Sequence, residues 1–144
     1  MPKIIEYKKV ITQQNTYELR EVEGTELCTI GDTTYFVIPG TVLPTGQSSE
    51  IQSSIKATTL TDVLNDKIRA ASPHCQLINQ RRRARLQDAG YSKDDTDYFI
   101  HLHIATQLGI VPVNAKRTAA LAAYIEAFKT AFVWAEQQYA ALGL

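Results

Sequence analysis

The stretch TELCTIGDTTYFVIPG, residues 25–40, decides the fold of the N-terminal part of the chain. Two runs rich in β-branched and aromatic residues flank Gly31-Asp32, a short polar pair that suits a tight turn. Pro39-Gly40 then ends the second run, because proline has no backbone N–H to donate to a strand ladder. The stretch therefore predicts an antiparallel β-hairpin that stops at Pro39.

The residues before this hairpin also favour strands. Residues 3–12, KIIEYKKVIT, are rich in β-branched side chains, and QQN makes a turn-like break after them. In residues 16–24, Tyr17 and Leu19 alternate with polar neighbours, the period-two pattern of a half-buried strand. We therefore expect residues 1–45 to form a small antiparallel meander or hairpin sheet.

The composition changes after the hairpin. Residues 40–58 are rich in Gly, Ser and Thr, which is typical of a linker or an extended surface crossing. We expect a linker at 46–58, followed by a helical part at 59–144. About forty residues of strand rarely hold together alone, so we expect one folding unit overall.

Four helices are predicted in the helical part. In the first, apolar residues recur at helical spacing from Leu60 to Ala71, with Thr59 as N-cap. A second helix begins at Pro73, which suits the first helical position, and stops at Gly90. Ser92 caps a third and Asn114 caps a fourth; these four helices and the sheet make an α+β fold.

The last predicted helix extends to about Leu142, with Gly143 just beyond, and is roughly 40 Å long at 1.5 Å per residue. Its apolar stripe indicates a core face or an oligomer seam. Trp134 lies off the main stripe, so we expect it to be exposed or covered by a partner. The candidate oligomer seam consists of Leu121, Tyr124, Phe128, Phe132, Trp134 and Tyr139.

Charge and length narrow the class of protein. The 144 residues carry 15 bases and 15 acids, and neither half has the excess of bases expected of a protein that coats nucleic acid. No apolar run approaches the roughly 20 residues that span a bilayer, so we expect no membrane contact. Without an apolar leader at the start, the expected location is the cytoplasm, and a protein that leaves the cell by lysis or in a particle would look the same.

Sequence motifs for metal binding, catalysis or phosphate binding are sparse. His101 and His103 are two residues apart, which on a helix turns them about 200° from each other, so we expect no metal site. His74 has no ligand neighbour, and Cys28 and Cys75 read as small buried side chains. No nucleophile elbow and no phosphate-binding glycine loop is present. We therefore expect no cofactor, no catalytic residues and no enzymatic activity.

The run QRRRARLQDAG, residues 80–90, is the strongest local charge signal. On a helix Arg81, Arg82, Arg83 and Arg85 point at about 0°, 100°, 200° and 40°, so they do not form one narrow stripe. Three readings stay open: a solvated face paired with acids such as Asp88, a contact for a protein partner, and a nucleic-acid contact. For the last two, the candidate residues are Arg81, Arg82 and Arg85.

Short motifs in two parts of the chain resemble a group of small tailed-phage and prophage proteins. The motifs are Ile38-Pro39, Leu43-Pro44, Ser72-Pro73-His74, Leu77-Ile78, Arg81, Trp134 and Leu142-Gly143-Leu144. The resemblance covers about the last half of the chain and a short part of the first. It implies a tail-module structural or assembly accessory protein that acts through protein contacts, and it carries over no catalytic residues.

These observations favour a non-enzymatic prophage-type structural or assembly protein. Exposed strand edges pair readily with other chains, and the long amphipathic helix needs a partner, so we expect a homo-oligomer. Other phage structural proteins are further expected partners. The alternatives are a nucleic-acid-binding regulator that uses the arginine run, and an enzyme with a pocket that gathers His74, His101 or His103 with acids.

Overall fold

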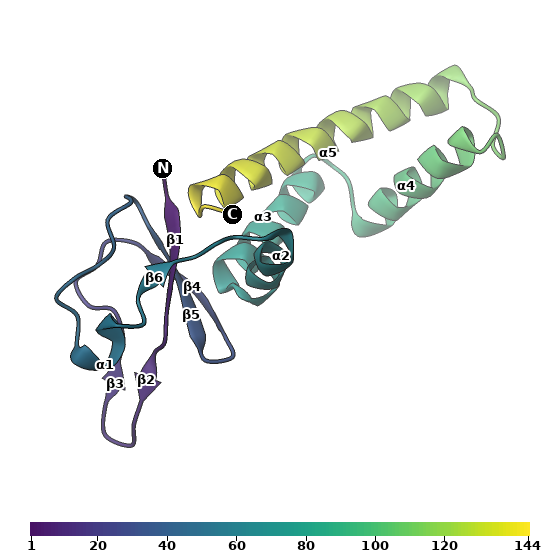
Figure 1. Ribbon diagram of the computed structural model, residues 1–144. Helices are drawn as coiled ribbons and strands as arrows, with labels where there is room; N and C mark the ends of the chain where they lie inside the picture. Colours follow the sequence, from purple (N-terminus) through teal and green to yellow (C-terminus); the bar gives the residue numbers. More distant parts are fainter. The chain divides into compact units, whose positions relative to one another are not determined.

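A computed structural model describes residues 1–144 and shows an α+β fold (Figure 1). An antiparallel sheet lies in the N-terminal part, and helices follow, the last of them the longest. The predicted fold class is therefore confirmed. The chain forms two compact units, which differ from the expected division: unit 1 comprises residues 1–77 and 138–144, and unit 2 comprises residues 78–137.

The main sheet of unit 1 has four antiparallel strands in the order β4-β5-β1-β6 (Figure 1). The expected hairpin is present, because β4 and β5 flank Gly31, whose φ of 65° suits a tight turn. The four strands are β1 (Lys3–Tyr7), β4 (Thr25–Ile30), β5 (Thr33–Ile38) and β6 (Lys56–Ala57).

A separate two-stranded ladder joins β2 (Val10–Ile11) to β3 (Thr16–Tyr17). The strand expected over residues 16–24 ends at Tyr17, so that prediction was wrong for most of its length. Glu21 has a φ of 54°, which no extended strand adopts, and Leu19 and Val22 pack into the core from irregular backbone. The apolar residues of this segment therefore alternate because their side chains are buried in the core, and not because the segment pairs as a strand.

The segment expected to be a linker is part of the sheet. It contains the short helix α1 (Ser49–Gln52) and the edge strand β6, in which Lys56 pairs with Glu6 of β1. Ile51 is fully buried, and Ile55 lies in the same core cluster. A Ser-rich stretch reads as a linker, but these two isoleucines anchor it to unit 1.

Both faces of the sheet are covered. On one face, a bulge between Glu26 and Cys28 adds Leu27 to β4, and both Leu27 and Cys28 join a core that holds Ile68 of helix α2 (Asp62–Ala71). The C-terminal residues of unit 1 pack on the same cluster. The cluster consists of Ile4, Leu27, Cys28, Tyr35, Val37 and Ile68, with Leu60, Leu64, Leu142 and Leu144 at its margin.

The opposite face is covered by the irregular segments and α1. Because β5 is buried on both faces, its residues do not alternate between apolar and polar. Gly24 crosses close to this strand, with a φ of 147° that favours glycine. The second cluster consists of Ile5, Tyr7, Phe36, Ile38, Ile51 and Ile55.

The helices begin at capping residues. Thr61, rather than the expected Thr59, caps α2 and accepts a hydrogen bond from the Leu64 N–H. Ser92 and Asn114 cap α4 and α5 as predicted, through bonds from Asp95 N–H and Arg117 N–H. The four long helices are α2 (Asp62–Ala71), α3 (Pro73–Asp88), α4 (Lys93–Gln107) and α5 (Ala115–Ala141).

Unit 2 contains most of α3, all of α4 and most of α5, and it has a small core. The Tyr124 ring stacks on Phe99 with centroids 5.0 Å apart and meets Tyr91 edge-on at 5.2 Å. Leu86 of α3 and Ala131 of α5 complete this cluster. The buried apolar residues of unit 2 are only Ile78, Leu86, Leu102, Tyr124, Ala131 and Ala135.

None of the helices has the length and apolar content that a bilayer-crossing segment needs.

Candidate functional site

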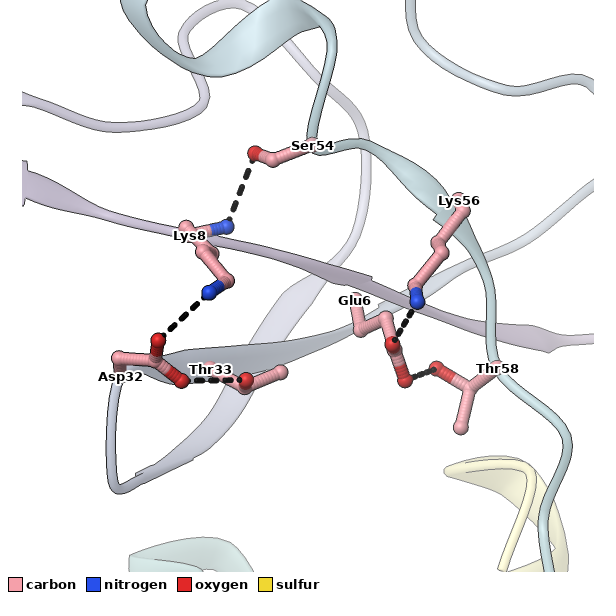
Figure 2. Close-up of polar contacts among 7 residues, drawn as sticks. All are labelled: Glu6, Lys8, Asp32, Thr33, Ser54, Lys56 and Thr58. Atoms are coloured by element: carbon pink, nitrogen blue, oxygen red, sulfur yellow. Dashed lines mark hydrogen bonds and ion pairs between the residues drawn. The ribbon is translucent and has the colours of Figure 1, made fainter.

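One polar cluster lies where β1, β6 and the β4–β5 turn meet (Figure 2). Lys8 Nζ lies 2.7 Å from Asp32 Oδ2, and Lys56 Nζ lies 3.0 Å from Glu6 Oε1. Hydroxyl groups complete both pairs: Thr33 donates to Asp32, and Thr58 donates to Glu6. The Lys8 backbone N–H donates to Ser54 Oγ at 3.0 Å.

A pocket of about 250 Å³ adjoins this cluster, lined among others by Tyr7 and Ser53. The hydrogen bond from Lys8 lowers the pKa of the Asp32 carboxyl, and the same bond raises the pKa of Lys8. Both side chains are mostly exposed, so water screens their attraction. Every charge at this pocket has a partner, and the contacts fasten residues 54–58 to β1 as a structural device.

The candidate metal and nucleophile residues are scattered. His101 and His103 are exposed on α4, and His74 is exposed on α3. No group of three metal-ligating side chains gathers anywhere in residues 1–144. Cys28 and Cys75 are free and buried, as expected, and desolvation raises the pKa of the Cys28 thiol to about 11. A thiol with that pKa is a poor nucleophile at neutral pH.

The arginine run occupies the second half of α3 and divides into two parts. Arg81 and Arg83 are exposed, Arg82 is half-buried, and none of the three forms a hydrogen bond or ion pair. No acid of the same chain, such as Asp88, pairs with these three arginines, although a solvated face paired with acids was one of the three open readings. Arg85 instead lies over the Trp134 ring, with its guanidinium carbon 4.2 Å from the centroid.

Arg85 and Trp134 belong to a groove between α3 and α5 within unit 2. One part of the groove, about 520 Å³, is lined by Ala127 and Ala131 of α5 and by Ala89 at the end of α3. A neighbouring part, about 430 Å³, is lined by Val133 and Trp134. The groove is open and shallow, and it contains two acids, Asp88 from α3 and Glu126 from α5.

Three of the six residues proposed as an oligomer seam are not available for one. Tyr124 is buried in the aromatic cluster of unit 2, and Tyr139 is buried in unit 1 under the guanidinium of Arg69. Trp134 is half-buried beneath Arg85, so a residue of the same chain covers it. These three aromatic side chains stabilise the monomer.

The remaining three residues of the proposed seam lie at the surface of α5, together with a fourth apolar residue, Ile125, that the proposed seam left out. Phe128 and Phe132 are 37% and 45% exposed, with ring centroids 6.0 Å apart. Ile125 is 42% exposed, and Leu121 is half-buried. We call Leu121, Ile125, Phe128 and Phe132 the α5 seam.

Other large apolar side chains of unit 2 are exposed as well. Ile100 and Ile104 of α4 and Leu108 at its C-cap follow one another at steps of four and are 45%, 49% and 68% exposed. Of fifteen large hydrophobic side chains that are exposed in the chain, ten belong to unit 2. Single exposed apolar side chains are common, but the α5 seam places adjacent ones along one helix face with two rings in contact, so it is the strongest candidate site.

Comparison with family models, with curated proteins and with solved structures finds no match to this chain.

Proposed function

We propose that this protein acts without catalysis, as a structural or assembly accessory protein that associates with itself through unit 2. Its short motifs at Ser72-Pro73-His74 and at the C-terminal Leu-Gly-Leu support a role in a phage tail module. Other structural proteins of such a module are proposed as further partners, in the cytoplasm or in the particle.

The observation that carries the proposal is the contrast between the two units. Unit 1 encloses its sheet between two apolar clusters, whereas unit 2 has six buried apolar residues and ten exposed large ones. Burial of apolar surface contributes about 25 cal/mol per Å², so a second protein surface stabilises unit 2 by covering these side chains. The paired charges at the unit 1 pocket offer no comparable site.

Light scattering during gel filtration of the full chain tests self-association. We expect a mass of at least twice 16.1 kDa at high protein concentration, falling toward 16.1 kDa on dilution. A mass of 16.1 kDa at every concentration up to the millimolar range would remove the proposal.

A nucleic-acid-binding function is the second candidate, and the free arginines of α3 favour it. Arg81 and Arg83 are exposed without ion partners, so both are free to contact phosphate. Arg85 is engaged with Trp134 and contributes less than expected. Binding to a mixed-sequence DNA duplex at low salt would support this function if it weakens steeply with salt and on Arg81→Glu. Absence of binding at low salt would exclude it.

A further inference from the structure

The spacing of the α5 seam is symmetric. From Leu121 to Ile125, Phe128 and Phe132 the steps are four, three and four residues, which are the d-a-d-a positions of a coiled coil. The same steps result when the seam is read backwards. An antiparallel copy of the helix therefore places apolar residues opposite apolar residues at every layer.

We propose that a second copy of this chain docks antiparallel on the α5 seam. Leu121 then lies opposite Phe132 of the second copy, and Ile125 lies opposite Phe128 of the second copy. The two-fold axis passes between Ile125 and Phe128, so each contact occurs twice, as an isologous dimer interface requires. This geometry rests on the proposed function, because it specifies where unit 2 associates with itself.

The charges beside the seam favour this orientation. Glu126 and Lys129 are both exposed, and neither has an ion partner within its own chain. In the antiparallel register, Lys129 of each copy lies next to Glu126 of the other copy. A parallel pair instead brings Lys116 and Arg117 of both copies to the same end, where like charges repel.

The space around the seam is open on the side that a second helix needs. Tyr124 and Ala131, which flank the seam on one side, are covered by residues of unit 2 such as Phe99 and Leu86. On the other side, Lys129 and Val133 are exposed. The partly exposed rings and Ile125 present on the order of 250 Å² of apolar surface, which is close to the size of the largest apolar patch on an ordinary monomer, a patch that is often functional.

Cross-linking between two different cysteine variants tests the orientation. Leu121→Cys and Phe132→Cys are made in separate full-length chains, one of them tagged, and mixed at a concentration where both sediment as dimers. The two native cysteines are buried, so mild oxidation affects only the new thiols. Positions 121 and 132 are 11 residues apart, or about 16 Å along the helix, which no disulfide spans.

The antiparallel dimer gives the 121–132 disulfide between tagged and untagged chains and no disulfide in either variant alone. Disulfides in each variant alone would show a parallel pair and overturn the proposal. Dimers without any disulfide would place the interface elsewhere, which overturns this geometry and leaves self-association standing. A chain that is monomeric throughout would overturn both.

Discussion

The guanidinium carbon of Arg85 lies 4.2 Å from the centroid of the Trp134 ring, and this contact joins α3 to α5 within unit 2. A cation held over an indole ring contributes about 0.5–1 kcal/mol at an exposed site. Two residues 49 positions apart thus stabilise a unit whose apolar core is small. The same contact removes Arg85 from the free arginines of the run.

Arg85→Ala should therefore lower the free energy of unfolding by about 0.5–1 kcal/mol in urea titrations followed by tryptophan fluorescence. The matched control is Arg83→Ala, which removes an exposed arginine of the same helix that contacts no ring. We expect Arg83→Ala to change stability by less than about 0.5 kcal/mol. Equal losses in the two variants would contradict a specific Arg85–Trp134 contact.

Whether an element of the fold could be predicted from the sequence depended on whether the residues that determine it lie close together along the chain. The β4–β5 hairpin and the caps at Ser92 and Asn114 were predicted, because turn and cap preferences act within a few residues. Strand β6 was missed because it is two residues long and pairs with β1 about fifty positions away. No local pattern in a Ser-rich stretch indicates such a partner.

Prediction of the candidate site on α5 was limited in the same way. Their helical spacing identified an apolar face, but spacing cannot tell which side chains α3 and α4 cover. Tyr124 and Trp134 proved to contact the chain's own residues, while Ile125 remained exposed and had been left out of the proposed seam. The steps of four, three and four residues from Leu121 to Phe132 were the signal that could have included Ile125 in the seam.

Ile68→Ala tests the core of unit 1. Ile68 is fully buried between α2 and the sheet, so truncating it leaves a cavity and should cost about 2–5 kcal/mol in urea unfolding. Val63→Ala on the same helix removes a side chain that is 65% exposed and should cost less than about 1 kcal/mol. A mild effect at Ile68 would mean that α2 does not pack on the sheet as described.

Gly24→Ala should destabilise the sheet strongly. A Cβ at this position would lie 2.1 Å from the Val37 carbonyl oxygen, and the backbone φ of 147° is one that alanine rarely adopts. We expect a loss of about 3 kcal/mol or more by thermal denaturation. Gly40→Ala, where a Cβ meets nothing within 4 Å, provides the control and should leave the melting temperature nearly unchanged.

Burial of Cys28 predicts a pH effect. Desolvation raises its pKa from 9.0 to about 11, so the unfolded chain loses this proton at a lower pH than the folded chain. The contribution to stability is complete below pH 9 and should be lost as the pH rises from 9 to about 11. Urea titrations of the wild type and Cys28→Ala across that range should differ in slope. Parallel pH profiles would show that the thiol titrates alike in both states.

The thiols also provide a chemical check on the folded state. In native protein at pH 8, a thiol reagent should modify neither Cys28 nor Cys75 within minutes, because both are buried. In denaturant both should react completely. Rapid reaction of either thiol in native protein would show that the core of unit 1 opens readily.

Sedimentation equilibrium of Ile125→Asp beside the wild type tests most directly whether the exposed α5 surface of unit 2 is where the chain associates with itself. Ile125 is 42% exposed, so the charge is tolerated in the monomer but is desolvated in a dimer. We predict that the dimer dissociation constant rises about 10- to 100-fold, while Val63→Asp, an equally charged change at an exposed position of α2, leaves it unchanged. Wild-type affinity in Ile125→Asp, with the helical content intact, would contradict the account.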